Sequence, residues 1–132
     1  MTTNAIRVHK SAEGKLRQDI DIGRHRIIAD ISEGLGGDDA GPDPHELLDA
    51  ALGACTALTA TMVARRKQIP LTDLKVEITH AEADGVYRMS RKLEFIGALT
   101  EEQKAYLLGI ADKCPVHKTL SGRFEIETVT KG

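Results

Sequence analysis

The feature that most constrains the fold is a long stretch that can only form a covered helix. Residues 47–64 are apolar or small on nearly every helical face. Asp43 is a good N-cap, Pro44 suits the first helical position, and Glu46 stands where a capping box places an acid. Pro70 ends the pattern. These residues predict a helix that begins at Pro44, ends before Pro70 and is buried on all sides.

Alternating apolar residues predict strands before and after this helix. Gly34 to Pro42 is rich in glycine and aspartate, lacks the Lys-Ser/Thr ending of a phosphate-binding loop, and is expected to be a connector. The order β-β-β-α-β-β-α-α-β predicts an α+β fold in one domain, residues 1–132. The predicted elements are strands at 6–10, 16–22 and 24–31, the central helix, strands at 74–80 and 87–96, helices at 100–113 and 114–122, and a strand at 123–129.

The composition indicates a thin core and excludes several partners. Aromatic residues make up only 3% and Trp is absent, so the core is aliphatic, and a partner surface would enlarge it. A net charge of −2 without a basic stripe gives no reason to expect nucleic acid. The apolar stretch 50–64 is interrupted by Gly and Thr and is too short to span a bilayer, and no signal peptide is expected at the start. We therefore expect a cytoplasmic protein with no membrane partner, whose thiols are kept reduced.

Cys55 and Cys114 are the only cysteines. By itself, Cys55 in an apolar helix is more typical of packing than of chemistry. Cys114 precedes Pro115 as the expected N-cap of a helix, where the positive end of the helix dipole stabilises a thiolate. Two such cysteines indicate a redox pair. In that chemistry a thiolate attacks the O–O bond of a peroxide, and the second thiol condenses with the sulfenic acid to a disulfide.

Other chemistries of cysteine and histidine are less well supported. Only Cys114 and His117 are close in sequence, and His9, His25, His45 and His80 form no second pair, so a metal site is not expected. The thiol chemistry itself needs no bound cofactor, only an external dithiol reductant. A cysteine-dependent hydrolase would take its base from His25, His45 or His117. A peroxide-reactive thiolate needs a permanent positive charge, for which the candidates are Arg17, Arg24 and Arg26.

Three motifs give the chain a close resemblance to the OsmC/Ohr family of thiol-dependent hydroperoxide reductases. They are Gly36-Gly37 followed by Gly41-Pro-Asp-Pro-His-Glu-Leu-Leu48, then 51–56 (Ala-Leu-Gly-Ala-Cys-Thr), and 110–120 (Ile-Ala-Asp-Lys-Cys-Pro-Val-His-Lys-Thr-Leu). The resemblance covers nearly the whole chain. It implies an intertwined homodimer in which antiparallel sheets wrap two long central helices, with active sites at the subunit interface.

The same resemblance assigns roles to four residues. Cys55 matches the peroxide-attacking cysteine and Cys114 the resolving one. Arg17 best matches the arginine that polarises the peroxide, and Glu46 the acid that orients this arginine. In better-characterised branches that acid directly follows the helix-opening proline, where this chain has His45. The shift of one residue turns the side chain by about 100° around a helix.

We therefore expect a peroxidase that prefers organic hydroperoxides because its pocket is aliphatic, with an external dithiol or lipoyl-type reductant as partner. Two alternatives stay open. One is a module of the same fold that binds a small lipophilic or thiol-reactive ligand without peroxidase activity. The other is the cysteine-dependent hydrolase, for which Cys114 would be dispensable.

Overall fold

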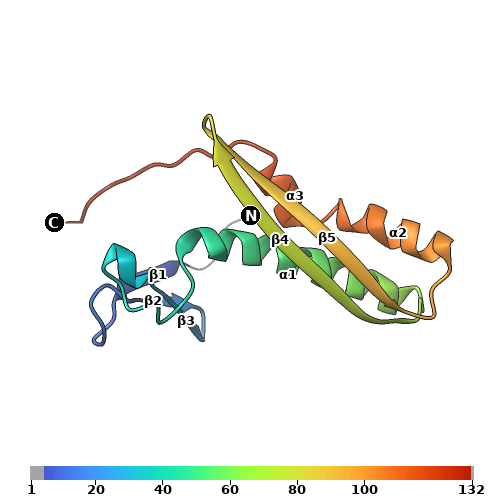
Figure 1. Cartoon of the computed structure of the whole chain (residues 1–132), viewed down its shortest axis with the longest axis horizontal. Helices are drawn as coiled ribbons and strands as arrows, with labels where there is room; N and C mark the ends of the chain where they lie inside the picture. The colour runs from blue at the N-terminus through green and yellow to red at the C-terminus, as the bar shows by residue number, and fades with distance from the viewer. Residues whose placement is uncertain (1–4, 132) are drawn as a thin grey trace. The chain divides into compact units, whose positions relative to one another are not determined.

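The computed structural model describes residues 5–131, which form an α+β fold as predicted (Figure 1). Two compact units divide the chain, one up to Leu48 and one from Asp49 onward. The long helix α1 (Pro44–Arg66) begins in the first unit and continues through the second. The assignment of residues 1–132 to one domain stays a prediction.

The first unit contains a three-stranded antiparallel meander, as the alternating pattern predicts. Its strands are β1 (Ile6–Lys10), β2 (Gln18–Ile22) and β3 (His25–Ala29), in the order β1-β2-β3. Gly23, with a φ of 59°, opens the two-residue turn between β2 and β3. Such turns require positive φ, which glycine adopts without strain.

The glycine-rich connector after β3 is organised by one buried carboxylate. Asp30, only 4% exposed, accepts the backbone N–H groups of Ile31 at 2.9 Å, Asp38 at 3.3 Å and Ala40 at 3.0 Å. The Ala40 and Ile31 N–H groups lower the pKa of Asp30 below its ordinary value, against the opposing effect of burial. The carboxylate therefore replaces the hydrogen bonds that this irregular segment cannot form with itself.

Glycine is required within this connector because the backbone passes close to itself. A Cβ on Gly37 would lie 2.3 Å from the carbonyl oxygen of Ile31, and one on Gly41 would lie 2.7 Å from that of Ile28. Before Gly37 the chain follows a single turn of 3-10 helix, η1 (Glu33–Leu35). The Gly-Gly and Gly-Pro pairs of the first motif thus have a structural role.

Helix α1 starts as predicted but is less covered than predicted. Asp43 and Glu46 form a reciprocal capping box, with both N–H···O distances at 2.9 Å. The buried residues of α1 follow one another at intervals of four and form a narrow face: Leu52, Thr56, Ala60 and Ala64. Leu58 and Met62, by contrast, are 63% and 59% exposed. The prediction of burial on all sides is therefore wrong for one chain, because the elements around α1 cover only part of its circumference.

The full length of α1 also exceeds the apolar stretch considered from the sequence. Its 23 residues are long and apolar enough to cross a bilayer by length and composition. The core helix of a soluble protein meets the same criteria, and here Asp49 on α1 forms hydrogen bonds to His80 and Tyr87 of the following hairpin. The criteria by themselves therefore give weak evidence for a membrane span.

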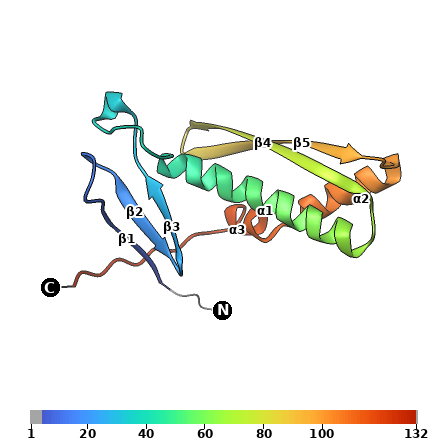
Figure 2. The ribbon, with the colours of Figure 1, turned by 90° about the horizontal axis from the view of Figure 1, so that it is seen from below.

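The second unit packs three helices on one side of a long β-hairpin. Strands β4 (Leu71–Ala83) and β5 (Val86–Gly97) pair antiparallel, and the predicted Asp84-Gly85 turn joins them. Helices α2 (Glu101–Ala111) and α3 (Pro115–Leu120) follow, and α1, α2 and α3 all lie on the same side of the hairpin (Figure 2). The capping box at Thr100 and the N-cap at Cys114 are both present, as predicted.

The last predicted strand is absent from the described part of the chain. Residues 123–131 have no regular secondary structure and extend from α3 toward the C-terminus (Figure 1). The alternating apolar side chains in this segment are exposed, with Ile126 at 87% and Val129 at 82%. The prediction is wrong for the single chain because a strand forms only where a second backbone accepts its hydrogen bonds.

We expect Asp30→Asn to lower the free energy of unfolding, because an amide offers one acceptor oxygen in place of two and carries no charge. Since the folded-state pKa of Asp30 lies below 3.8, its contribution is present above the unfolded-state pKa and is lost as pH falls through the folded-state value. The difference between wild type and variant should thus shrink below about pH 4. Urea unfolding between about pH 7 and pH 3 measures this difference.

Asp39→Asn is the matched control for this experiment. Asp39 lies in the same connector, is exposed and has a φ of 51°, a conformation that asparagine also adopts. It should leave the pH dependence of stability unchanged. A difference between wild type and Asp30→Asn that does not vary with pH would contradict the assigned role of this carboxylate.

Candidate thiol site

The two cysteines, 59 positions apart in sequence, meet in the second unit. Cys55 lies in the middle of α1 and is half-buried, whereas Cys114 is the fully buried N-cap of α3. Both are free thiols, and the Cys114 thiol is close enough to act as a hydrogen-bond donor to the Cys55 sulfur. The structure therefore brings together the two residues that the sequence indicates as a redox pair.

The surroundings of Cys55 favour its thiolate. Burial raises the pKa of Cys55, but hydrogen bonds from the Val116 backbone N–H, the Cys114 thiol and the Thr59 side chain together outweigh that effect. The net result is a pKa below the ordinary value of 9.0. The Thr59 hydroxyl lies 3.9 Å from the sulfur, one helical turn further along α1. A thiolate, not a thiol, is the nucleophile in cysteine chemistry.

Cys114 is held by its own backbone environment. Its sulfur accepts the His117 backbone N–H at 3.3 Å, which is the N-cap bond of α3. Its own N–H donates to the carbonyl oxygen of Ala111 at 3.3 Å, and its carbonyl accepts the Lys118 N–H at 3.2 Å. The turn between α2 and α3 therefore fixes both the position and the direction of this side chain.

Arg91 is a residue of this site that the sequence analysis missed. Its Nη1 donates to the Thr56 hydroxyl oxygen and to the Ala111 carbonyl oxygen, both at 3.0 Å, and its Nη2 donates to a carboxylate oxygen of Asp112 at 2.7 Å. The signal was present in β5, where Arg91 occupies the face that otherwise carries Met89 and Leu93. A lone charge on the covered face of an alternating strand indicates a specific polar partner inside.

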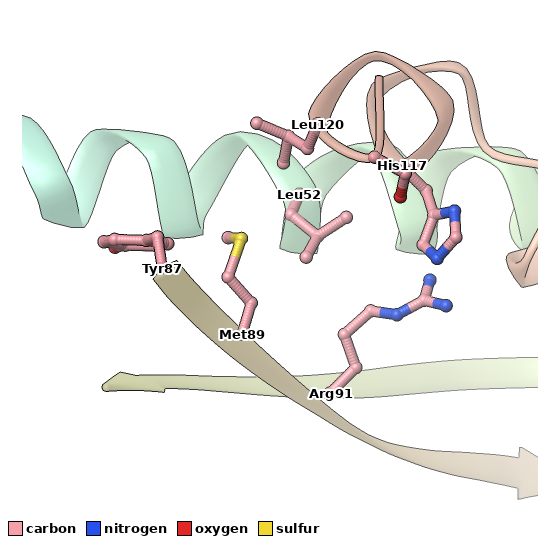
Figure 3. A pocket seen from close by; sticks show the side chains of 7 residues that line it. Leu52, Tyr87, Met89, Arg91, His117 and Leu120 are labelled. Atoms are coloured by element: carbon pink, nitrogen blue, oxygen red, sulfur yellow. The ribbon is translucent and has the colours of Figure 1, made fainter. Parts of the chain in front are cut away.

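A cavity of about 370 Å³ opens beside Arg91 (Figure 3). In Figure 3 the guanidinium of Arg91 and the imidazole of His117 face one another at one end, and Leu52 and Met89 lie further along. The lining residues are Leu52, Tyr87, Met89, Arg91, His117, Leu120 and Ser121. The cavity thus offers both a polar end and an aliphatic wall.

A second polar cluster joins the start of the second unit to the hairpin. Asp49 accepts a hydrogen bond from the Tyr87 hydroxyl at 2.7 Å, and its other oxygen pairs with Nδ1 of His80. The His80 and Tyr87 rings stack at 4.6 Å between centroids. The sequence hint was an acid within an apolar helix, which needs a partner when it is covered.

The remaining predicted site residues lie in the first unit. Arg17, directly before β2, is 21% exposed and pairs with Glu13 at 3.2 Å. Its Nε is buried and has no hydrogen-bond partner among residues 5–131. Glu46 uses Oε1 for the capping box. A buried donor without a partner is rare in folded proteins, which distinguishes Arg17 from its two alternatives.

The alternatives to Arg17 are placed in or beside the turn of the meander. Arg24 is exposed in the turn that joins β2 to β3. Arg26, on β3, is 57% exposed and pairs with Asp21 at 2.7 Å and Asp19 at 3.8 Å across the sheet. Arg26 therefore already has carboxylate partners within the meander. Within the described ranges, no group of three or more His, Cys, Asp or Glu is arranged to hold a metal ion.

Comparison with known proteins gives one family and many related folds. The sequence model of the family described as OsmC-like protein matches residues 36–129. No curated protein matches the chain significantly. An OsmC-like protein of Mycoplasma pneumoniae superposes with a TM-score of 0.75 at 20% identity, over 92% of this chain and 89% of that one.

Two organic hydroperoxide resistance proteins have related structures. The protein of Elizabethkingia anophelis, solved with thiocyanate bound, gives a TM-score of 0.64 at 21% identity, over 92% of this chain and 91% of that one. The OsmC protein of Legionella pneumophila gives 0.62 at 17% identity, with 92% and 93% covered. At these identities the likeness establishes the fold.

The environment of Cys55 predicts a specific response to changes at Cys114. Cys114→Ala removes a hydrogen-bond donor from Cys55, so the pKa of Cys55 should rise. Cys114→Ser retains a donor and should give a pKa between those of Cys114→Ala and wild type. The pH dependence of iodoacetamide alkylation, followed by mass spectrometry of the Cys55 peptide, measures the three values. Equal pKa values in all three proteins would contradict the assigned contact between the thiols.

Proposed function

Because the chain belongs to the OsmC-like protein family, we propose that it is a thiol-dependent peroxidase that reduces hydroperoxides through Cys55 and Cys114. The observation that carries this proposal is the contact between the two thiols, together with the lowered pKa of Cys55. A nucleophile whose pKa lies below the ordinary thiol value and that has a second thiol beside it meets both requirements of the reaction.

The reaction has two steps on the protein and one outside it. The Cys55 thiolate attacks the hydroperoxide, an S–O bond forms, the O–O bond breaks, and the alkoxide takes a proton and leaves as the alcohol. The Cys114 thiolate then attacks the sulfenic sulfur, an S–S bond forms, and hydroxide leaves and is protonated to water. An external dithiol or lipoyl-type partner supplies two electrons and two protons to restore both thiols.

In this proposal Arg17 polarises the hydroperoxide and Glu46 orients Arg17. The buried Nε of Arg17, which has no partner within residues 5–131, supports a role for this residue beyond its ion pair with Glu13. The capping bond of Glu46 uses Oε1, so Oε2 can still accept from a guanidinium. His45 follows Pro44 in this chain, and the acid is therefore one position later on α1.

An organic hydroperoxide is the preferred substrate in this proposal. The aliphatic wall that Leu52, Met89 and Leu120 give the cavity beside Arg91 favours an apolar group over hydrogen peroxide. Two structural relatives are named organic hydroperoxide resistance proteins, which supports the same class. We also propose a cytoplasmic location without a membrane partner, where dithiol reductants are present.

We further propose that the protein is an intertwined homodimer. The exposed apolar residues of α1, among them Leu58 and Met62, and the unpaired segment 123–131 support this assembly. A second chain would cover the open face of α1 and provide a backbone with which the C-terminal segment can pair. Such an arrangement allows residues of both chains to contribute to one site.

A ligand-binding module without peroxidase activity is the second candidate. The cavity of about 370 Å³, with its polar end and aliphatic wall, is of a size that holds a small organic molecule. None of the lining residues is a cysteine. In this case neither Cys55 nor Cys114 would be needed for binding, so substitution of the cysteines separates the two candidates.

Treatment of the reduced protein with limiting cumene hydroperoxide should remove both thiols in near-stoichiometric amounts, faster than hydrogen peroxide does. Intact mass and free-thiol counts measure the loss. Cys114→Ser should stop at the sulfenic acid, and Cys55→Ser should not react, because the nucleophile is gone. Thiols that survive an excess of both peroxides would contradict the peroxidase and leave the binding module.

Ile126→Asp should weaken the dimer by about 100-fold or more, equivalent to roughly 2.8 kcal/mol, because it would place a charge in the new interface. Glu127→Gln, the neighbouring position in the same segment, is the control and should have little effect. Sedimentation over a range of concentrations measures the dissociation constant. A monomeric wild type, or equal constants for wild type and Ile126→Asp, would contradict the assembly.

A further inference from the structure

We propose that Arg91 is a positioning residue that holds the resolving thiol beside the attacking one. The inference rests on the proposed function in one respect, which is that Cys114 forms a disulfide with Cys55. Arg91 touches neither sulfur through any bond of the described structure. Its three hydrogen bonds instead join the two backbone segments that carry the thiols.

The first of these segments is the turn that carries Cys114. The carbonyl oxygen of Ala111 accepts the backbone N–H of Cys114 at 3.3 Å and also Nη1 of Arg91 at 3.0 Å. Ala111 is fully buried, so neither hydrogen bond can be replaced by water without opening the core. Arg91 therefore fixes the acceptor that holds the backbone of Cys114.

The second segment is the turn of α1 that carries Cys55. Thr56, the next residue along the helix, is fully buried and donates its hydroxyl proton to the Leu52 carbonyl at 2.7 Å. Its oxygen lone pairs are left to accept Nη1 of Arg91. One nitrogen atom of Arg91 is thus hydrogen-bonded both to the residue after Cys55 and to the acceptor of the Cys114 N–H.

The charge of Arg91 is balanced within the same arrangement. Its side chain is only 13% exposed, and Nη2 pairs with the Asp112 carboxylate at 2.7 Å. A guanidinium presents several donors in a fixed plane, whereas a lysine ammonium is a point charge on a flexible stem. The site therefore requires arginine chemistry, since three acceptors on two segments are bound from one rigid group.

These hydrogen bonds of Arg91 matter for the second chemical step, in which the disulfide forms. When Cys114 attacks the Cys55 sulfenic acid, the sulfur atoms must come to about 2.05 Å from each other as hydroxide leaves. The rate and the equilibrium of this step both depend on how narrowly the two thiols are confined. Loss of Arg91 should widen their distribution, and the disulfide should become less stable relative to the dithiol.

The test is the thiol–disulfide equilibrium of the full chain in glutathione buffers, which needs no peroxide. Arg91→Met keeps the length of the apolar stem but removes the donors. It should lower the equilibrium constant for disulfide formation about tenfold, which raises the reduction potential by about 30 mV. Arg88→Met is the matched control on the same strand, because Arg88 is exposed and lies on the opposite face of β5. It should leave the potential unchanged.

The reduction potential of the Cys55–Cys114 pair distinguishes a role of Arg91 in positioning the thiols from a general contribution to the stability of the fold. A residue that only stabilises the fold affects the reduced and oxidised proteins equally and does not move their equilibrium. An unchanged reduction potential in Arg91→Met would therefore overturn the proposal, even if the variant unfolds at a lower urea concentration than wild type. Arg91→Lys should recover only part of the wild-type value, and full recovery would overturn the requirement for the planar group.

Asp112→Asn provides the test if Arg91→Met does not fold. It keeps Arg91 and an acceptor oxygen for Nη2 but removes the negative charge of the ion pair, and Asp112 is 64% exposed, so the fold should tolerate the change. The expected drop in the equilibrium constant is about threefold, and no change would overturn the proposal. A wild-type protein that forms no disulfide in oxidised glutathione would also overturn it.

The peroxide reaction distinguishes this proposal from the proposed function. If the wild-type thiols do not react with peroxide but Arg91→Met still raises the reduction potential, the peroxidase is overturned and the positioning role is supported. In a working peroxidase, dimedone should trap a larger fraction of the oxidised Cys55 as sulfenic acid in Arg91→Met than in wild type, because the resolving step is slowed. Equal trapping in Arg91→Met and wild type would overturn the positioning role and leave the peroxidase intact.

Discussion

The thiol site depends on the close packing of one narrow face of α1. This face is built from small side chains at intervals of four residues, with Thr56, Ala60 and Ala64 all essentially inaccessible. Small residues leave room for side chains of neighbouring elements, and Leu107 and Ala111 of α2 are fully buried as well. Because Cys55 lies next to this face and Cys114 follows α2, the same packing brings the thiols together.

Polar groups inside this packing supply the directional part of the structure. A core of Ala, Leu and Thr sets distances between backbones but fixes no orientation, since apolar contacts are not directional. Arg91 and the N-cap of α3 add that orientation through hydrogen bonds at defined atoms. The pKa of Cys55 then follows from geometry, because two of the three donors that lower it, the Val116 N–H and the Cys114 thiol, belong to the turn that carries Cys114.

The exposed apolar surfaces of the single chain have a common cause. Few aromatic residues and a small core leave apolar side chains exposed on α1 and along residues 123–131. Local sequence signals predicted the capping boxes, the Asp84-Gly85 turn and the N-cap at Cys114, because each depends on residues within a few positions of one another. The final strand could not be judged in this way, since its formation depends on a partner backbone and not on its own alternation.

The sequence by itself determined the order and type of the strands and α-helices through α3 and marked both cysteines, because periodicity, caps and turns are local properties. The tertiary structure alone decided that Cys55 and Cys114 meet, and that the inward arginine of β5 joins their two backbones. It also decided which face of α1 is buried, a question that a helix apolar on nearly all faces leaves open. The physical reason is that contacts between distant segments depend on how whole elements pack, and that packing has no signature within a short window of sequence.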